Sequence, residues 1–179
     1  GLIPCGLACR DSLRAGAVLP LSHQDIGNWH FVNNPWQFAL PYNDDGSGFT
    51  KDFIGADAIL HSTSRLFTYP FAGFDPRKVD RGEHTKVVDE EGKLLGTVLS
   101  CVTDVGIDRI DGRIVSMSQS DLPEGFRPRG LCCGFIKVRR ALEIGERVFL
   151  QDARRKLSVE VVDDIRPNRS ARRAMKEMV

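Results

Sequence analysis

The sequence lacks a long hydrophobic run, a marked net charge and a glycine-rich phosphate-binding loop. No apolar stretch approaches the roughly 20 residues that a membrane-spanning helix needs, so we expect no membrane partner. The 25 basic and 24 acidic residues leave a formal net charge of +1. This balance gives no bulk attraction to nucleic acid, and we expect no nucleic-acid partner either. Neither G-x-G-x-x-G nor G-x-S-x-G occurs, so the motifs of dinucleotide binding and of a serine nucleophile are missing.

The composition is that of a folded chain. Of the residues, 41% are hydrophobic and 27% charged. The length of 179 residues is enough for one ordinary domain or two small ones. The chain opens with Gly1-Leu2-Ile3-Pro4, without Met and without a basic start followed by an apolar segment. We therefore expect the N-terminus of the whole protein to lie upstream, with a processed mature end as the alternative.

The five cysteines form no known zinc-binding pattern, because their number is odd and no spacing fits. We expect no metal site. Two of them, Cys132 and Cys133, are adjacent and would point to opposite faces of a strand. We expect buried, reduced thiols in a cytoplasmic protein. A metal or redox role for Cys5 and Cys9, spaced C-x3-C, is the alternative.

The first 60 residues predict little regular structure. Helix-compatible residues favour a short helix over Asp11–Val18, which Pro20 would end. Alternation of aromatic residues predicts a strand over Trp36–Leu40. Asn43–Gly48 has the composition of a loop, and Lys51–Leu60 reads as a turn that enters a short helix.

After His61 the pattern changes to short strands at roughly even spacing, separated by turns with Gly or Asp. This arrangement predicts an α+β chain that is mainly β, with a closed antiparallel barrel of jelly-roll or Greek-key type that leaves few exposed edges. Gly96 falls inside one strand and predicts a bulge or bend there. The basic tail, Arg166–Val179, is either a solvated strip or a contact for a polyanion or partner. The predicted strands are Leu66–Phe71, Thr85–Val88, Leu94–Val102, Arg113–Met117, Gly130–Val138, Arg147–Leu150 and Leu157–Val162.

Arg10 and Arg14 are the candidate binding residues. They are four apart, so a helix would place both on one face. Two guanidinium groups on one face suit a ligand with carboxylates, because each can make paired hydrogen bonds to a carboxylate. The alternative is that Asp11 and Arg14 pair with each other on the surface, which would contribute little to stability.

A family resemblance starts at the same place. The stretch Gly6–Arg14, GLACRDSLR, resembles the GLGARDxLR stretch of the glycine-cleavage T-protein (aminomethyltransferase) family. Further segments resemble later family motifs, in the same order along nearly the whole chain. They are Leu19–Leu21 with Asp25–Ile26 for "aGLxLYGxDI", Lys51–Ala56 for "KxDFIGxxAL", Gly96–Ser100 for "GxVTSG", Cys133–Ile136 for "AMGYV" and Asp163–Pro167 for "xxPFxP".

The resemblance implies a fold and a function. Residues 1–60 would be the end of the folate-binding region, and residues 61–179 the C-terminal β-barrel domain with the basic tail. Proteins of this family take the aminomethyl group from the lipoyl arm of the H-protein, transfer a one-carbon unit to tetrahydrofolate and release ammonia. Arg10 would hold substrate, with Arg14 as the second choice. Trp29, Phe31, Trp36 and Phe38 would either stack on the pterin ring or form domain core.

The sequence also departs from the family pattern. The family's catalytic aspartate lies upstream of the first motif, so no catalytic residue is assigned, and we expect no turnover from these 179 residues alone. The segment Leu13–Ala17 lacks the Glu of the family's "LRLEAG". Whether the chain is an enzyme is therefore left open. The alternatives are a related folate-dependent demethylase and a non-catalytic β-barrel binding module.

Overall fold

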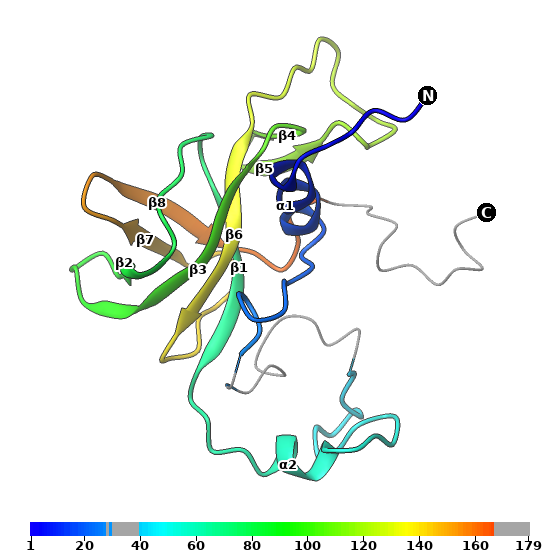
Figure 1. Ribbon diagram of the computed structural model, residues 1–179, viewed down its shortest axis with the longest axis vertical. Coiled ribbons are helices and arrows are strands. Elements are labelled where there is room, and N and C mark those ends of the chain that lie inside the picture. Colours follow the sequence, from blue (N-terminus) through cyan, green and yellow to red (C-terminus); the bar gives the residue numbers. More distant parts are fainter. Residues whose placement is uncertain (28, 30–39, 167–179) are drawn as a thin grey trace.

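The computed structural model describes residues 1–27, 29 and 40–166. Six strands close into an antiparallel barrel in the order β1-β6-β3-β2-β7-β8, and β4 and β5 pair in a separate two-stranded sheet (Figure 1). The mainly β fold with a closed antiparallel barrel is thus confirmed. Barrel neighbours are mostly not consecutive in sequence, so the chain crosses over as a Greek-key-like barrel requires. The strands are β1 (Phe67–Gly73), β2 (Gly82–Val88), β3 (Leu94–Asp104), β4 (Ile107–Ile110), β5 (Arg113–Ser116), β6 (Leu131–Val138), β7 (Arg147–Gln151) and β8 (Lys156–Val161).

Seven of these strands match the sequence prediction to within a few residues, and β4 was missed. Its sequence, Ile107-Asp108-Arg109-Ile110, does not alternate, so periodicity gives no strand signal there. The turn that follows β4 did carry a sequence signal for a hairpin. Asp111 and Gly112 have φ values of 50° and 79°, and an Asp-Gly pair with positive φ is typical of a tight hairpin turn.

Strand β6 separates two hydrophobic cores. Its alternate residues Cys132, Ile136 and Val138 face the barrel interior, where they pack with Phe71 and Val98. Leu131, Cys133 and Phe135 of the same strand face the other way and lie in a second core outside the barrel. The prediction that Cys132 and Cys133 point to opposite faces is confirmed. The second core contains Ala15, Val18, Ala72, Ile107, Leu131, Cys133, Phe135, Val162 and Ile165.

Helix α1 (Leu7–Gly16) packs on the outside of the barrel against β3 and β6 (Figure 1). It begins four residues before and ends two residues before the predicted helix. It begins directly after Gly6, whose backbone is extended. Its end precedes Pro20, because Val18 already has a left-handed φ of 54°, which a helix does not allow.

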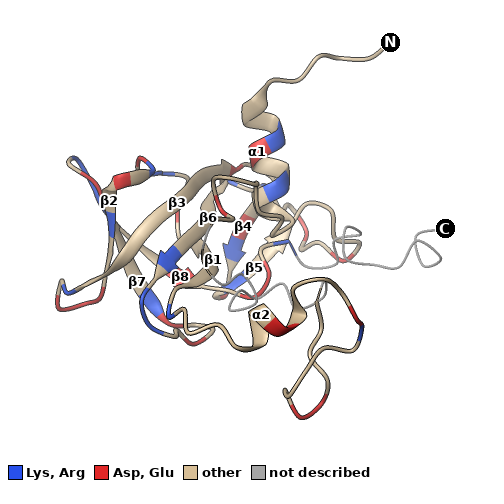
Figure 2. Ribbon diagram, turned by 60° about the horizontal axis from the view of Figure 1, so that its bottom comes forward, with Lys and Arg blue, Asp and Glu red and all other residues tan. Residues whose placement is uncertain are grey.

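The rest of the N-terminal part adds one short helix, α2 (Ala56–Leu60), which confirms the prediction for that segment. In Figure 1 it lies apart from the barrel, beyond the start of β1. The predicted strand Trp36–Leu40 falls almost wholly outside the described residues. Among the described residues, no helix has the length and apolar character to span a membrane. Lys and Arg are interspersed with Asp and Glu around the barrel (Figure 2).

Two glycines let β3 and β6 approach each other closely. A Cβ at Gly96 would lie 1.9 Å from the carbonyl oxygen of Lys137, and one at Gly134 would lie 2.0 Å from that of Ser100. The predicted irregularity at Gly96 is confirmed, because the pairing of β2 with β3 shifts register between Val87 and Val88, beside it. Gly96 is needed there for the close backbone contact.

We predict that Gly96→Ala lowers the free energy of unfolding by about 2 kcal/mol, because the backbone of β6 must move to admit the methyl group. The measurement is urea unfolding. Gly6→Ala is the matched control, since a Cβ at Gly6 meets nothing within 4 Å. Equal stability of the two variants would contradict the close-contact explanation.

Candidate functional site

The C-terminal half of α1 is tied to the loop that follows it by a buried ion pair. Arg14 donates from Nη1 to Oδ2 of Asp25 at 2.5 Å and from Nε to Oδ1 of Asp11 at 2.8 Å. The backbone N–H of Leu21 also donates to Asp25, at 2.9 Å. The Asp11–Arg14 pair therefore forms as the alternative predicted, but its location on the surface was wrong. The Arg14 side chain is only 9% exposed, and Asp25 is fully buried.

Arg10 and Arg14 both contact the carboxylate of Asp11. Arg10 Nη2 lies 3.2 Å from Oδ1 of Asp11, the atom that also accepts from Arg14. The hydrogen bond from Arg14 is the main cause that holds the pKa of Asp11 below its usual range, so Asp11 is ionised at neutral pH. The Arg10 side chain is 53% exposed. Of the two arginines, Arg10 is the one whose guanidinium group faces solvent.

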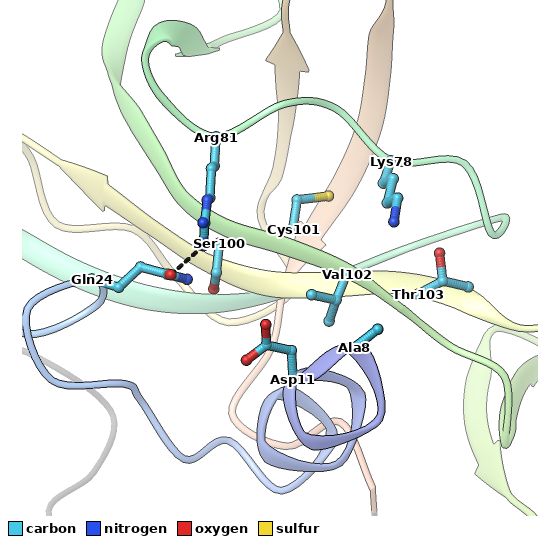
Figure 3. Close-up of a pocket in the computed structure, with 9 residues that line it drawn as sticks. All are labelled: Ala8, Asp11, Gln24, Lys78, Arg81, Ser100, Cys101, Val102 and Thr103. Carbon is cyan, nitrogen blue, oxygen red and sulfur yellow. Dashed lines mark hydrogen bonds between the residues drawn. The ribbon is translucent and has the colours of Figure 1, made fainter. Parts of the chain in front are cut away.

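A cleft of about 280 Å³ lies between α1, β3 and the segment before β2 (Figure 3). Lys78 and Arg81 line one wall and make no ion pair with the described residues. Arg81 donates to the side-chain oxygen of Gln24 across the cleft. The hydroxyl of Ser100 is buried and has no hydrogen-bond partner among the described residues. The lining residues are Ala8, Asp11, Gln24, Lys78, Arg81, Ser100, Cys101, Val102 and Thr103.

The charges of this cleft favour an anionic ligand. The one carboxylate among the lining residues, Asp11, already accepts hydrogen bonds from Arg10 and Arg14. The two cations on the opposite wall are therefore not neutralised from within the cleft, and such a wall attracts carboxylates. Lys78 and Arg81 were not predicted from the sequence. Their only signal was a charged run, Lys78–Arg81, between two predicted strands.

Two other sets of candidate residues were considered from the sequence, the cysteines and the aromatic residues. Cys5 and Cys9 are exposed rather than buried, although all five thiols are free. Trp29 donates from Nε1 to Thr68 at 2.8 Å, and Lys137 lies over its ring at 4.1 Å from the centroid. These contacts pack Trp29 against the barrel. The other three aromatic residues considered for pterin stacking lie outside the described residues.

The comparisons with known proteins point to one family. No family model matches the chain. An aminomethyltransferase of Symbiobacterium thermophilum is 36% identical over 46% of this chain. Aminomethyltransferases of Streptomyces coelicolor and Lysinibacillus sphaericus are 33% and 32% identical over 56% and 55% of it. The crystal structure of glycine cleavage system aminomethyltransferase T from Bartonella henselae superposes on 88% of this chain with a TM-score of 0.54 and 24% identity, which shows a shared fold.

Two comparisons, one of structure and one of sequence, therefore confirm the resemblance to the aminomethyltransferase family. The fold is shared with part of a glycine cleavage system aminomethyltransferase T, as the superposition shows. The sequence is similar to the aminomethyltransferase family, whose members are the curated relatives found. The alignments cover only 20% to 27% of those relatives, and 37% of the solved structure is matched.

We predict that Asp25→Ala lowers the free energy of unfolding by about 3 kcal/mol, because it leaves the buried Arg14 with one partner fewer. Asp75→Ala is the control. It breaks an ion pair with Arg77 whose side chains are 67% and 38% exposed, and such pairs contribute less than about 1 kcal/mol. The measurement is urea unfolding of both variants, which compares their free energies of unfolding. Similar losses would mean that the Arg14–Asp25 pair has no special role.

Proposed function

We propose that this chain is part of a tetrahydrofolate-dependent aminomethyltransferase of the glycine-cleavage type. The observation that carries the proposal is the similarity, at 32% to 36% identity, to curated aminomethyltransferases from several bacteria. The donor would be the aminomethyl group on a lipoyl-carrying H-protein, and the acceptor tetrahydrofolate. We further propose that the protein acts in the cytoplasm.

Arg10 is the residue that we propose to hold the folate. Tetrahydrofolate supplies the nitrogen atoms that accept the one-carbon unit, and its glutamate end carries carboxylates. The half-exposed guanidinium of Arg10 fits such a group, because it can exchange water for carboxylate oxygens. Lys78 and Arg81, in the cleft beside the same helix, add to the attraction.

Arg14 remains the second candidate, with a different role. Its Nη2 atom has no hydrogen-bond partner among the described residues, but this atom is buried. A buried guanidinium that already bonds Asp11 and Asp25 acts on a ligand through the groups it orients. We therefore propose that Arg14 positions Asp11, and through it Arg10.

We propose the domain division that the resemblance implies. Residues 1–60 would complete the folate-binding region, and residues 61–179 would form the barrel domain. Because α1 packs into the second core against β6, Arg10 is held in a fixed place relative to the barrel. The barrel would thus form one wall of the folate site, and the rest of that site would come from residues outside this chain.

We predict that Arg10→Ala weakens tetrahydrofolate binding about tenfold or more, the cost of losing a charged hydrogen bond to a carboxylate. The measurement is isothermal titration of the full-length protein. Arg140→Ala is the matched control, because Arg140 is 47% exposed and pairs with one carboxylate, Glu146. An unchanged affinity in Arg10→Ala would favour the non-catalytic binding module.

A product assay separates the transferase from the demethylase. The full-length protein is supplied with tetrahydrofolate and, in separate reactions, with aminomethyl-loaded H-protein or with a methylated small molecule. Ammonia release with the H-protein supports the proposed function. Methyl transfer to folate without ammonia release would replace it with the demethylase.

A further inference from the structure

Cys101 and Cys132 lie side by side on the inner face of the barrel. Strands β3 and β6 pair Cys101 with Gly134 and Thr103 with Cys132. The two cysteines are therefore diagonal neighbours on one face of an antiparallel pair, where long side chains reach each other. The two thiols are close enough for each to shift the pKa of the other. Gly134, opposite Cys101, has no side chain to separate the two sulfur atoms.

The two thiols differ in access. Cys101 is half-buried and lines the cleft beside α1, whereas Cys132 belongs to the barrel core. In Figure 3 the sulfur of Cys101 points away from α1, toward the segment that carries Lys78. A small reagent that enters the cleft therefore meets Cys101 first.

The surroundings of Cys101 also favour the thiolate form, which is the nucleophile. Hydrogen bonds from the thiol of Cys132 and from the backbone N–H of Val79, together with the charge of Lys78, lower the pKa of Cys101, although burial and Asp152 oppose them. By contrast, the contact with Cys101 and burial raise the pKa of Cys132. Of the two thiols, Cys101 is therefore the one more readily deprotonated.

We propose that Cys101 and Cys132 form a reactive dithiol that low-molecular-weight disulfides oxidise. The Cys101 thiolate attacks one sulfur of the reagent, forms a mixed disulfide and releases one thiolate. Cys132 then loses its proton to solvent and attacks the Cys101 sulfur, which forms the Cys101–Cys132 disulfide and releases the second thiolate. Two cysteine thiols are oxidised, and one reagent disulfide is reduced to two thiols.

The product would link β3 to β6 beside the cleft. Diagonal neighbours have Cα atoms about 7–8 Å apart, beyond the roughly 4.4–6.8 Å usual for a disulfide, so the backbones of β3 and β6 must move toward each other for the bond to form. The bond is therefore expected to be reducible by a small thiol, as strained disulfides are. The inference does not depend on the proposed folate function, since it needs only the two strands and the cleft.

The test uses oxidised glutathione on the folded full-length protein with Cys5→Ser and Cys9→Ser, which remove the exposed thiols. Peptide mapping by mass spectrometry then follows Cys101, Cys132 and Cys133. We expect a Cys101–Cys132 disulfide without retained glutathione, formed at least about tenfold faster than any adduct at Cys133. Cys133 is an internal control, because it lies on the same strand but faces the outer core, where burial raises its pKa.

Two variants test the order of the steps. With Cys132→Ser, the reaction should stop at a glutathione adduct on Cys101. With Cys101→Ser, Cys132 should react no faster than Cys133. Equal reactivity of Cys101 and Cys133 in the first experiment, which needs no substitution in the barrel, would overturn the proposal. So would a lasting glutathione adduct on Cys101 while Cys132 is present.

Discussion

The position of α1, and with it the candidate site, depends on one buried bidentate ion pair at the end of β3. Arg166 donates to Asp104 through Nε at 2.6 Å and through Nη2 at 2.5 Å, and its backbone N–H donates to the carbonyl of Gly16 at 3.1 Å. The end of α1, β3 and the chain after β8 therefore meet at one point. A Cβ at Gly16 would lie 2.5 Å from Oδ2 of Asp104, so this junction requires glycine as the last helical residue.

Apolar burial and ion pairs have separate roles in holding α1. Burial of Ala15 and Val18 in the second core supplies the favourable free energy. A buried ion pair adds little net stability over an apolar replacement, because both charges lose their water. What such pairs impose is a single geometry, since leaving a partner unpaired is costly. Asp104 and Asp25 thus fix the helix, whose apolar side alone would allow several orientations, and with it the direction of Arg10.

The sequence predicted what depends on local pattern and missed what depends on contacts between distant residues. The barrel could be predicted because its strands alternate, as in β6 with Cys132 inside and Cys133 outside. The helix boundaries could not, because Val18 takes a left-handed conformation that its residue type disfavours. Nor could the second, fully buried partner of Arg14 be predicted, since nothing local marks Asp25. The cationic wall of the cleft comes from a segment more distant still, which only the closed barrel brings beside α1.

The cleft connects the two kinds of chemistry proposed for this chain. Lys78 faces it as an unneutralised cation, suited to a carboxylate ligand, and the same charge favours the thiolate of Cys101. A carboxylate bound at Lys78 would offset that charge and cover the approach to the sulfur. Conversely, an adduct on Cys101 would occupy the space that the ligand needs. Because both effects would act through Lys78 and the volume of the cleft, a bound anion would slow the oxidation of Cys101, and an adduct on Cys101 would weaken anion binding.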